Sequence, residues 1–166
     1  MSNVRIRRPH PPVFAAECDA VSAIFIASRR ATLPQVREVH SDEETYAWMR
    51  EIVFPRYSVW LAEVDGEIVG FAARDGAWLI HLYMKPGWTG KGIGKRLLDV
   101  VIKEAATRTQ VLRLHTFARN AGARRFYERH GFVAAAFGDG ANNKEGEPDV
   151  LYELMLIQQE PQVRRH

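Results

Sequence analysis

Apolar residues recur along the chain at two spacings, which predict short strands interspersed with helices. A spacing of two predicts a strand with one buried face, and a spacing of three or four predicts a helix. Strands are expected at 4–8, 57–64, 67–74, 77–84, 111–116, 132–137 and 150–156, and helices at 14–30, 41–52, 93–108 and 120–130. This order predicts a mixed α/β domain with an antiparallel first half. It lacks the strict βαβ repetition of a doubly wound dinucleotide-binding fold.

Turn and cap residues lie at the predicted boundaries. Asp65-Gly66 and Asp75-Gly76 separate consecutive strands and are typical of tight hairpin turns. Ser41, followed by three acidic residues, is a predicted helix N-cap. Asn120 is a second predicted N-cap, and Gly131 is expected to end that helix in the left-handed region.

Composition and charge limit the classes of protein that the chain can represent. The chain has 166 residues, 46% hydrophobic and 26% charged, which indicates one domain, expected over 1–157, with a C-terminal tail at 158–166. The net charge of +3 is too small to indicate a nucleic-acid partner. The longest apolar run, Ala20–Ala27, is too short to cross a bilayer, so no membrane partner is expected. The single cysteine, Cys18, excludes an internal disulfide and favours a reducing, cytoplasmic location.

The stretch Lys85–Leu98, KPGWTGKGIGKRLL, places several glycines and lysines immediately before an amphipathic helix. Glycine permits positive φ and lets the main chain approach a ligand closely. The start of the helix exposes unpaired N–H groups and a partial positive charge. The glycines Gly90, Gly92 and Gly94 therefore predict a pocket for a phosphate or a pyrophosphate.

Two familiar phosphate-binding motifs do not match this loop. A P-loop requires Gly-x-x-x-x-Gly-Lys-Ser/Thr, but Thr89 stands at the first glycine position and Arg96 follows Lys95. A dinucleotide fingerprint requires Gly-x-Gly-x-x-Gly, but Leu97 stands at the third glycine when the motif begins at Gly92. From the loop alone, the alternative that this stretch is only a glycine-rich turn joining a strand to a helix is not excluded.

Two longer stretches, LYMKPGWTGKGIGKRLL at 82–98 and RNAGARRFYERHGF at 119–132, resemble the GCN5-related N-acetyltransferases (GNAT). In that family a strand of the type L-Y-V-x-P leads into R/Q-x-x-G-x-G/A at the start of a helix. The segment N-x-x-A-x-x-F-Y-x-x-x-G-F follows later. The resemblance covers roughly half of the chain, from Trp78 to Phe132. It implies a central, mostly antiparallel twisted sheet flanked by about four helices.

The resemblance also implies acetyl-CoA as cosubstrate. Its pyrophosphate would lie on the glycine loop, formed by Thr89, Gly90, Lys91, Gly92, Ile93, Gly94 and Lys95. Its pantetheine arm would lie beside the main chain of Leu82, Tyr83 and Met84 as an additional strand. Thr89 departs from the usual Arg or Gln, which puts one side-chain contact to phosphate in doubt.

The helix after Asn120 carries the expected acid. Helical spacing places Asn120, Arg124 and Tyr127 on one stripe, which we expect to face the cofactor. The resemblance implies that Tyr127 donates a proton to the departing CoA thiolate and that Asn120 contacts the cofactor arm. The alternatives are a simple N-cap for Asn120 and a core tyrosine for Tyr127, and both stay open.

The sequence leaves more than one candidate for the general base. Some family members carry a glutamate where this chain has Trp78. Strand alternation predicts one face with Leu79, His81 and Tyr83 and another with Ile80, Leu82 and Met84. His81 has a suitable intrinsic pKa for a base, but a buried histidine satisfied by the backbone fits equally well. Proton loss through water, from an amine held near Glu43, Asp75 or Asp149, also stays open. No metal-ligand spacing is found, and no metal is expected.

The predicted activity is N-acetylation of a primary amine by direct attack on the thioester, because Cys18 lies far in sequence from the cofactor loop. A main-chain N–H of the strand at Leu82 would polarise the acetyl carbonyl. The alternatives are a non-catalytic acyl-CoA-binding sensor or interaction domain, and an enzyme acting on nucleoside triphosphates. A homodimer is compatible with the sequence, which does not determine the oligomeric state.

The acceptor amine is not identified by the sequence; a small molecule, a peptide N-terminus and a protein lysine all fit. The family places the acceptor pocket near the first two helices and the last hairpin. The loop at 138–149 is either a solvated hairpin tip or an acidic gate for a cationic amine, formed by Asp139, Glu145, Glu147 and Asp149. Nearby aromatic residues are either core or pocket residues: Trp48, Phe54, Tyr57, Trp60 and Trp78.

Overall fold

The computed structural model describes residues 3–157, and the predicted tail at 158–166 lies outside the described residues. Seven strands form one sheet: β1 (Val4–Arg7), β2 (Ser58–Val64), β3 (Glu67–Asp75), β4 (Trp78–Met84), β5 (Val111–Phe117), β6 (Val133–Gly138) and β7 (Asp149–Met155). The helices are α1 (Phe14–Thr32), α2 (Asp42–Trp48), α3 (Phe54–Arg56), α4 (Ile93–Ala105) and α5 (Ala121–Arg129). The mixed α/β architecture with a mostly antiparallel sheet is confirmed.

The predicted helix at 41–52 is longer than expected. A π-helical turn at Met49–Val53 connects α2 to α3, so the helical stretch continues to Arg56. Pro55 is tolerated because it lies in the first turn of α3, where its missing N–H costs little. At the start of α2, Ser41 and Glu44 form a reciprocal capping box, as the acidic sequence there indicates.

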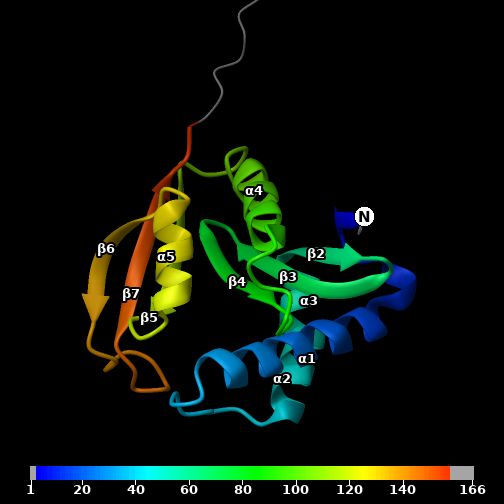
Figure 1. The fold of residues 1–166 in the computed structure, drawn as a ribbon, viewed down its shortest axis with the longest axis horizontal. Coiled ribbons are helices and arrows are strands. Elements are labelled where there is room, and N and C mark those ends of the chain that lie inside the picture. Colours follow the sequence, from blue (N-terminus) through cyan, green and yellow to red (C-terminus); the bar gives the residue numbers. More distant parts are fainter. Residues whose placement is uncertain (1–2, 158–166) are drawn as a thin grey trace, which may run out of the picture.

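The sheet consists of two antiparallel parts joined by one parallel contact. Its strand order is β1-β2-β3-β4-β5-β7-β6, and only β4 and β5 are parallel. These two strands are paired only at Trp78 and Arg113, whereas the neighbouring antiparallel pairs have several paired positions. In Figure 1, β4 and β5 diverge. The sheet is therefore open between β4 and β5, and we call this opening the wedge.

A β-bulge in β4 changes which residues share a face. Ala73 pairs with His81, but the next residue, Arg74, pairs with Leu79, so Ile80 is the extra residue. The expectation that Leu79 shares a face with His81 and Tyr83 was therefore wrong. Leu79 packs in the core on the α4 side, whereas His81 lies against aromatic rings on the α1 side.

The two faces of the sheet carry separate apolar cores. One core packs under α4 and α5 and includes Leu97, Leu98 and Tyr152. The other packs under α1 and the helical stretch after it, and it includes Val21 and Phe71. By length and composition alone, the helical stretch Pro11–Thr32 could cross a membrane. A core helix passes the same test, and α1 contacts β3 and β4 along one face.

Candidate active site

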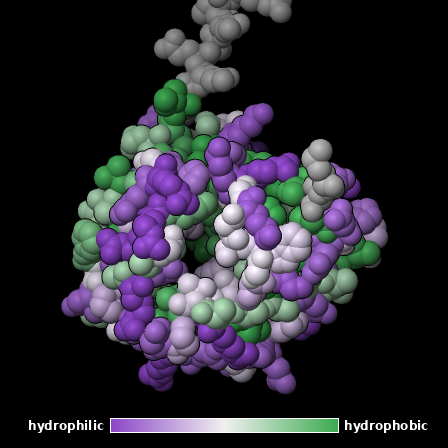
Figure 2. Space-filling model, viewed as in Figure 1, coloured by the Kyte–Doolittle hydropathy of each residue, from purple (hydrophilic) through white to green (hydrophobic). Residues whose placement is uncertain are grey.

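The wedge between β4 and β5 is the first component of the site. Beyond Trp78 and Arg113, no residue of β4 is paired with β5, so one main-chain edge of β4 lies open toward the wedge. Figure 2 shows the surface hollowed near the centre of this view, at the place where β4 and α5 stand apart in Figure 1. An open strand edge can accept an extended ligand as an additional strand. The predicted pantetheine-binding residues Leu82, Tyr83 and Met84 lie on this part of β4.

The glycine loop at the start of α4 is the second component. Gly90 and Gly92 have φ values of 72° and 80°, a conformation that residues with a side chain rarely adopt. A Cβ built on either glycine meets nothing within 4 Å, so the loop borders open space. No side chain caps α4, and no N–H group from Gly92 to Lys95 donates to another described residue. These amides and the helix dipole fit a pyrophosphate.

Other residues of the predicted loop differ in what they contribute. Gly94 has an ordinary φ, and a Cβ there would make normal contacts with Phe126 at 3.8 Å. Neither the backbone conformation nor the packing of α4 against α5 therefore requires a glycine at position 94. The Lys91 ammonium lies 5.8 Å from the Trp88 ring, at the edge of the loop. Arg96 points away from the loop and donates to the carbonyl oxygen of Val4.

Tyr127 lies on α5 with only 8% of its surface exposed. Its ring packs against Phe126, Phe132 and Tyr152, with centroids 5.3, 5.4 and 6.4 Å away. Its hydroxyl makes no hydrogen bond to any residue within 3–157. Burial, with a smaller contribution from Tyr83, raises the pKa of Tyr127. The phenol therefore retains its proton over the whole physiological range, as a proton donor must.

The other two residues of the predicted stripe have structural contacts. The Asn120 side chain accepts a hydrogen bond from the Ala123 amide, so Asn120 is an N-cap. Arg124 donates to the Tyr152 hydroxyl at 3.0 Å and to the Ala118 carbonyl at 3.4 Å. The predicted cofactor role of Arg124 therefore competes with an internal role, since its guanidinium holds α5 against β7.

His81, the candidate base, is almost completely enclosed, with 6% of its surface exposed. Aromatic rings surround it, with Trp48 at 5.0 Å and Phe25 at 5.4 Å between centroids. Neither ring nitrogen has a hydrogen-bond partner among the described residues. Burial, with a smaller contribution from the Arg29 charge, lowers the pKa of His81 to about 3. The expected backbone hydrogen bond is not found, and this imidazole is a weak base.

The carboxylates of the loop at 138–149 have different partners. Glu147 binds Arg119, and Asp149 contacts Asn143 and His115. Glu145 instead reaches Arg29 on α1, with 3.9 Å between the charged atoms. Burial raises the pKa of Tyr83, and the charges of Arg29 and Glu145 act on it in opposite directions. Glu145 is thus the loop carboxylate that approaches β4.

Sequence reasoning named Glu145 only within the loop and missed its partner Arg29. No local pattern marks Arg29, because its neighbours come from α1, β4, β5 and the distant loop. The proposed proton-accepting positions Glu43 and Asp75 are both exposed. Over residues 3–157, no group of three or more His, Cys, Asp or Glu side chains is arranged to hold a metal.

Comparison with known proteins agrees with this geometry. The model of the acetyltransferase (GNAT) family matches residues 23–132, which include β4, the glycine loop, α4 and α5. The chain belongs to the GNAT acetyltransferase family. As a member of that family it is an acetyl-CoA-dependent N-acetyltransferase.

Similar proteins cover most of this GNAT acetyltransferase. The uncharacterized N-acetyltransferase YafP of Escherichia coli is 28% identical over 138 residues, which are 80% of this chain and 83% of YafP. An uncharacterized N-acetyltransferase of Archaeoglobus fulgidus is 35% identical over 106 residues, 51% of this chain and 72% of that protein. The structure of YncA from Salmonella typhimurium, solved with its cofactor acetyl-CoA, superposes with a TM-score of 0.72 at 22% identity. The superposition covers 96% of this chain and 98% of YncA.

Proposed function

We propose that this acetyltransferase binds acetyl-CoA in the wedge and acetylates a primary amine by direct attack. The observation that carries the proposal is the alignment of two open features: the unpaired edge of β4 and the uncapped amides at the start of α4. The first suits an extended pantetheine arm and the second suits a pyrophosphate. YncA, which has the same fold, was solved with acetyl-CoA, and this supports acetyl-CoA as the ligand of the site.

Direct attack is favoured because the chain offers no accessible thiol nucleophile. Cys18 is buried on α1, and burial raises the pKa of its thiol. A buried thiol of raised pKa holds little thiolate and cannot be reached by an acyl donor. When bound, acetyl-CoA supplies an activated acetyl thioester that an amine can attack. A main-chain N–H on the open edge of β4 would donate a hydrogen bond to the acetyl oxygen.

Tyr127 would donate the proton that the CoA thiolate requires. The hydroxyl has no hydrogen-bond partner among the described residues, and burial keeps it protonated. A thiol with a pKa near 8.5 is already a fair leaving group, so this donation should contribute at the lower end of the ~10²–10⁴-fold range of general acid catalysis.

Proton removal from the amine is the more demanding requirement. An alkylammonium with a pKa of about 10.4 is neutral in only about one molecule in 2,500 at pH 7. His81 is unsuited to remove this proton because its imidazole is enclosed and its pKa is about 3. We therefore propose that the proton leaves through water near Glu145. This loop carboxylate pairs with Arg29, and its charge acts on the pKa of Tyr83 in β4.

An acceptor screen with thiol detection tests this function. Purified protein, acetyl-CoA and a panel of primary amines are expected to release free CoA at a rate that depends on the amine. The acyl-CoA sensor, the alternative motivated by the missing family glutamate at Trp78, predicts acetyl-CoA binding by calorimetry without amine-dependent release. An enzyme acting on nucleoside triphosphates would be protected from heating by ATP as strongly as by CoA.

A further inference from the structure

Arg29 and Glu145 form a loose ion pair that is mostly covered by protein. Their charged atoms are 3.9 Å apart, and their side chains are only 22% and 17% exposed. Neither side chain makes a hydrogen bond to any described residue. By contrast, the exposed pair of Arg30 and Glu38 has two hydrogen bonds, at 2.7 and 3.1 Å.

This contrast matters because the charged atoms of this pair are open to a ligand. A guanidinium has five N–H donors and a carboxylate accepts about four hydrogen bonds, and no described residue uses them here. The charged atoms of both side chains reach solvent, so a ligand can replace water at them. Arg29 and Glu145 therefore present an unused donor fork beside an unused carboxylate, which suits a ligand carrying both a negative and a positive group.

The pair lies close to the proposed acetyl-CoA site. The Arg29 guanidinium is 5.6 Å from the rings of Phe25 on α1 and Phe117 at the end of β5. Phe25 in turn packs edge-on against Tyr83 of β4, with centroids 5.1 Å apart. Arg29 thus stands beside the ends of both strands that border the wedge. The aromatic rings provide an apolar wall next to the charged pair.

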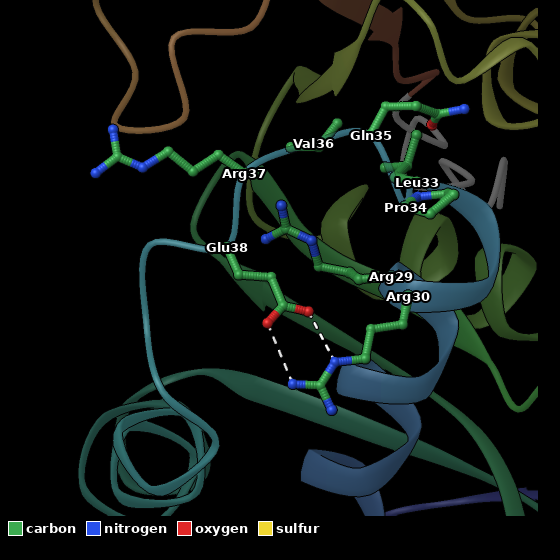
Figure 3. Close-up of a pocket in the computed structure, with 8 residues that line it drawn as sticks. All are labelled: Arg29, Arg30, Leu33, Pro34, Gln35, Val36, Arg37 and Glu38. Carbon is green, nitrogen blue, oxygen red and sulfur yellow. Dashed lines mark hydrogen bonds and ion pairs between the residues drawn. The ribbon is translucent and has the colours of Figure 1, made fainter.

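A cavity of about 400 Å³ adjoins Arg29 at the C-terminal end of α1. Leu33 and Val36 contribute apolar atoms to its lining, which also includes the charged side chains of Arg30, Arg37 and Glu38. Figure 3 shows Arg30 joined to Glu38 by dashed lines, whereas Arg29 has no partner among the residues drawn. Arg29, which lies near Phe117 at the end of β5, therefore also borders this pocket, and it makes no hydrogen bond to the other lining residues.

We infer that the acceptor is an α-amino acid with an apolar side chain, whose carboxylate binds Arg29 and whose ammonium group lies at Glu145. This inference rests on the proposed acetyl transfer and narrows its acceptor class. The two charges of a zwitterion match the two charges of the pair, and the bidentate geometry of Arg favours a carboxylate. A protein lysine and a peptide N-terminus offer an amine without an adjacent carboxylate, so they would leave Arg29 unsatisfied.

Calorimetry on the protein saturated with CoA measures the affinity for an acceptor without requiring turnover. The probes are leucine, methionine and phenylalanine, each paired with the amine that lacks only its carboxylate: isoamylamine, 3-(methylthio)propylamine and phenethylamine. We expect at least one amino acid to bind about 10-fold or more tightly than its paired amine, because the amine lacks the charge-assisted bidentate contact to Arg29. Equal affinity within every pair, or no binding of any amino acid, overturns the inference.

Substitutions of Arg29 and Glu145 test whether the difference in affinity between an amino acid and its amine comes from this ion pair. Arg29→Gln should abolish the advantage of the amino acid over its amine, and Glu145→Gln should weaken both members of a pair. The matched control is Arg108→Gln, because Arg108 is exposed after α4 and has no contact in the site. Retained CoA affinity and an unchanged unfolding temperature establish that each variant is folded. An advantage that survives Arg29→Gln, or that is lost equally in the control, contradicts the inference.

The failure of this inference is distinguishable from failure of the proposed function. If amines without a carboxylate are acetylated as well as the amino acids, acetyl transfer stands and the acceptor class is wrong. If amino acids bind through Arg29 but no CoA is released from acetyl-CoA, the acceptor site stands and the catalytic role is wrong.

Discussion

Burial has opposite consequences for the two titratable residues that the sequence suggested for catalysis. It raises the pKa of Tyr127 and so retains the proton that an acid must give. It lowers the pKa of His81 and so keeps the imidazole neutral but weakly basic. The sequence predicted the helix that positions Tyr127, together with its stripe of Asn120, Arg124 and Tyr127. It could not predict the isolation of His81, because the enclosing rings come from α1, α2 and β3.

Tyr127→Phe is expected to lower kcat with an alkyl amine by about 10²-fold, because the thiolate then departs without a proton donor. The acetyl-CoA affinity should change little, since the ring and its packing are retained. Tyr46→Phe on α2 is the control. Steady-state kinetics under conditions where chemistry limits the rate provide the measurement. Unchanged turnover in the Tyr127 variant would remove this residue from the acid role.

His81 should make the folded state less stable in acid. The unfolded histidine has a pKa of about 6.5, whereas the folded pKa is about 3. Between these values the unfolded chain binds a proton that the folded chain does not, so the free energy of unfolding falls as the pH falls. The slope from this group approaches about 1.4 kcal/mol per pH unit, and above about pH 6.5 the group contributes no slope.

His81→Leu removes this titration and the unpaired ring nitrogens. Urea unfolding between pH 6 and pH 4 should show a smaller loss of stability for the variant than for the wild type. His10→Gln, at an exposed position, should retain the wild-type slope. Parallel curves for the wild type and His81→Leu would mean that the imidazole is accessible to protons in the folded state.

At the scale of elements, the site depends on two local interruptions of regular structure. The glycine loop leaves the first amides of α4 without partners. The bulge at Ile80 interrupts the alternation of β4 side chains between the two faces of the sheet. The loop could be predicted, because glycines before an amphipathic stretch are visible in the sequence. The bulge could not, because it is defined by pairing with β3 and no residue near Ile80 demands it.

Gly92→Ala tests the loop. The substitution forces a side chain into a φ of 80° and places a Cβ in the open space of the cradle. We expect the acetyl-CoA affinity, measured by calorimetry, to fall at least 10-fold, with a loss of stability of about 1 kcal/mol from strain. Gly66→Ala in the β2–β3 turn is the matched control, since Gly66 has a φ of 83° and also borders open space.

The control variant separates backbone strain from cofactor binding. Gly66→Ala should lose similar stability and keep its full affinity for acetyl-CoA. Equal affinities for the two variants would show that the loop at Gly92 does not hold the cofactor.

At the scale of the whole molecule, one carboxylate connects the N-terminal half of the sheet to α4. Glu104, near the end of α4, accepts hydrogen bonds from Arg8, Ser58 and Arg74. Burial opposes its ionisation, but hydrogen bonds from Ser58 and Arg74 outweigh that cost and lower the pKa of Glu104. Since α4 carries the glycine loop at its other end, this cluster fixes the helix relative to the sheet.

Glu104→Gln should destabilise the fold by about 3 kcal/mol, because it leaves the buried guanidinium of Arg74 without a counter-charge. Glu67→Gln removes an exposed pair with Lys85 and should cost less than about 1 kcal/mol. Chemical denaturation of both variants at pH 7 gives the comparison. Similar small losses for the two variants would mean that the Glu104 cluster is no more important than a surface pair.

The order and type of nearly all elements could be predicted from periodicity and turn residues, because each of these signals is local. The opening of the sheet could not be predicted from these local signals, and only the family resemblance implied it, by placing an additional strand beside Leu82–Met84. It arises because β4 and β5 are parallel strands paired at one position, and this depends on how the β5–β7–β6 part packs against the rest. For the same reason the sequence did not indicate Arg29, because its neighbours come together only in the folded chain.

The central claim is that acetyl-CoA lies in the wedge with its pyrophosphate on the amides that begin α4. Titration of ¹⁵N-labelled protein with acetyl-CoA, followed by amide NMR, tests it most directly. The account predicts the largest shift changes at Gly90, at residues Gly92–Lys95 and along Leu82–Met84, because the N–H groups that face the wedge there gain hydrogen-bond partners and their neighbours on β4 border the cofactor. Saturable binding that leaves these amides unshifted, or no binding at all, would contradict it.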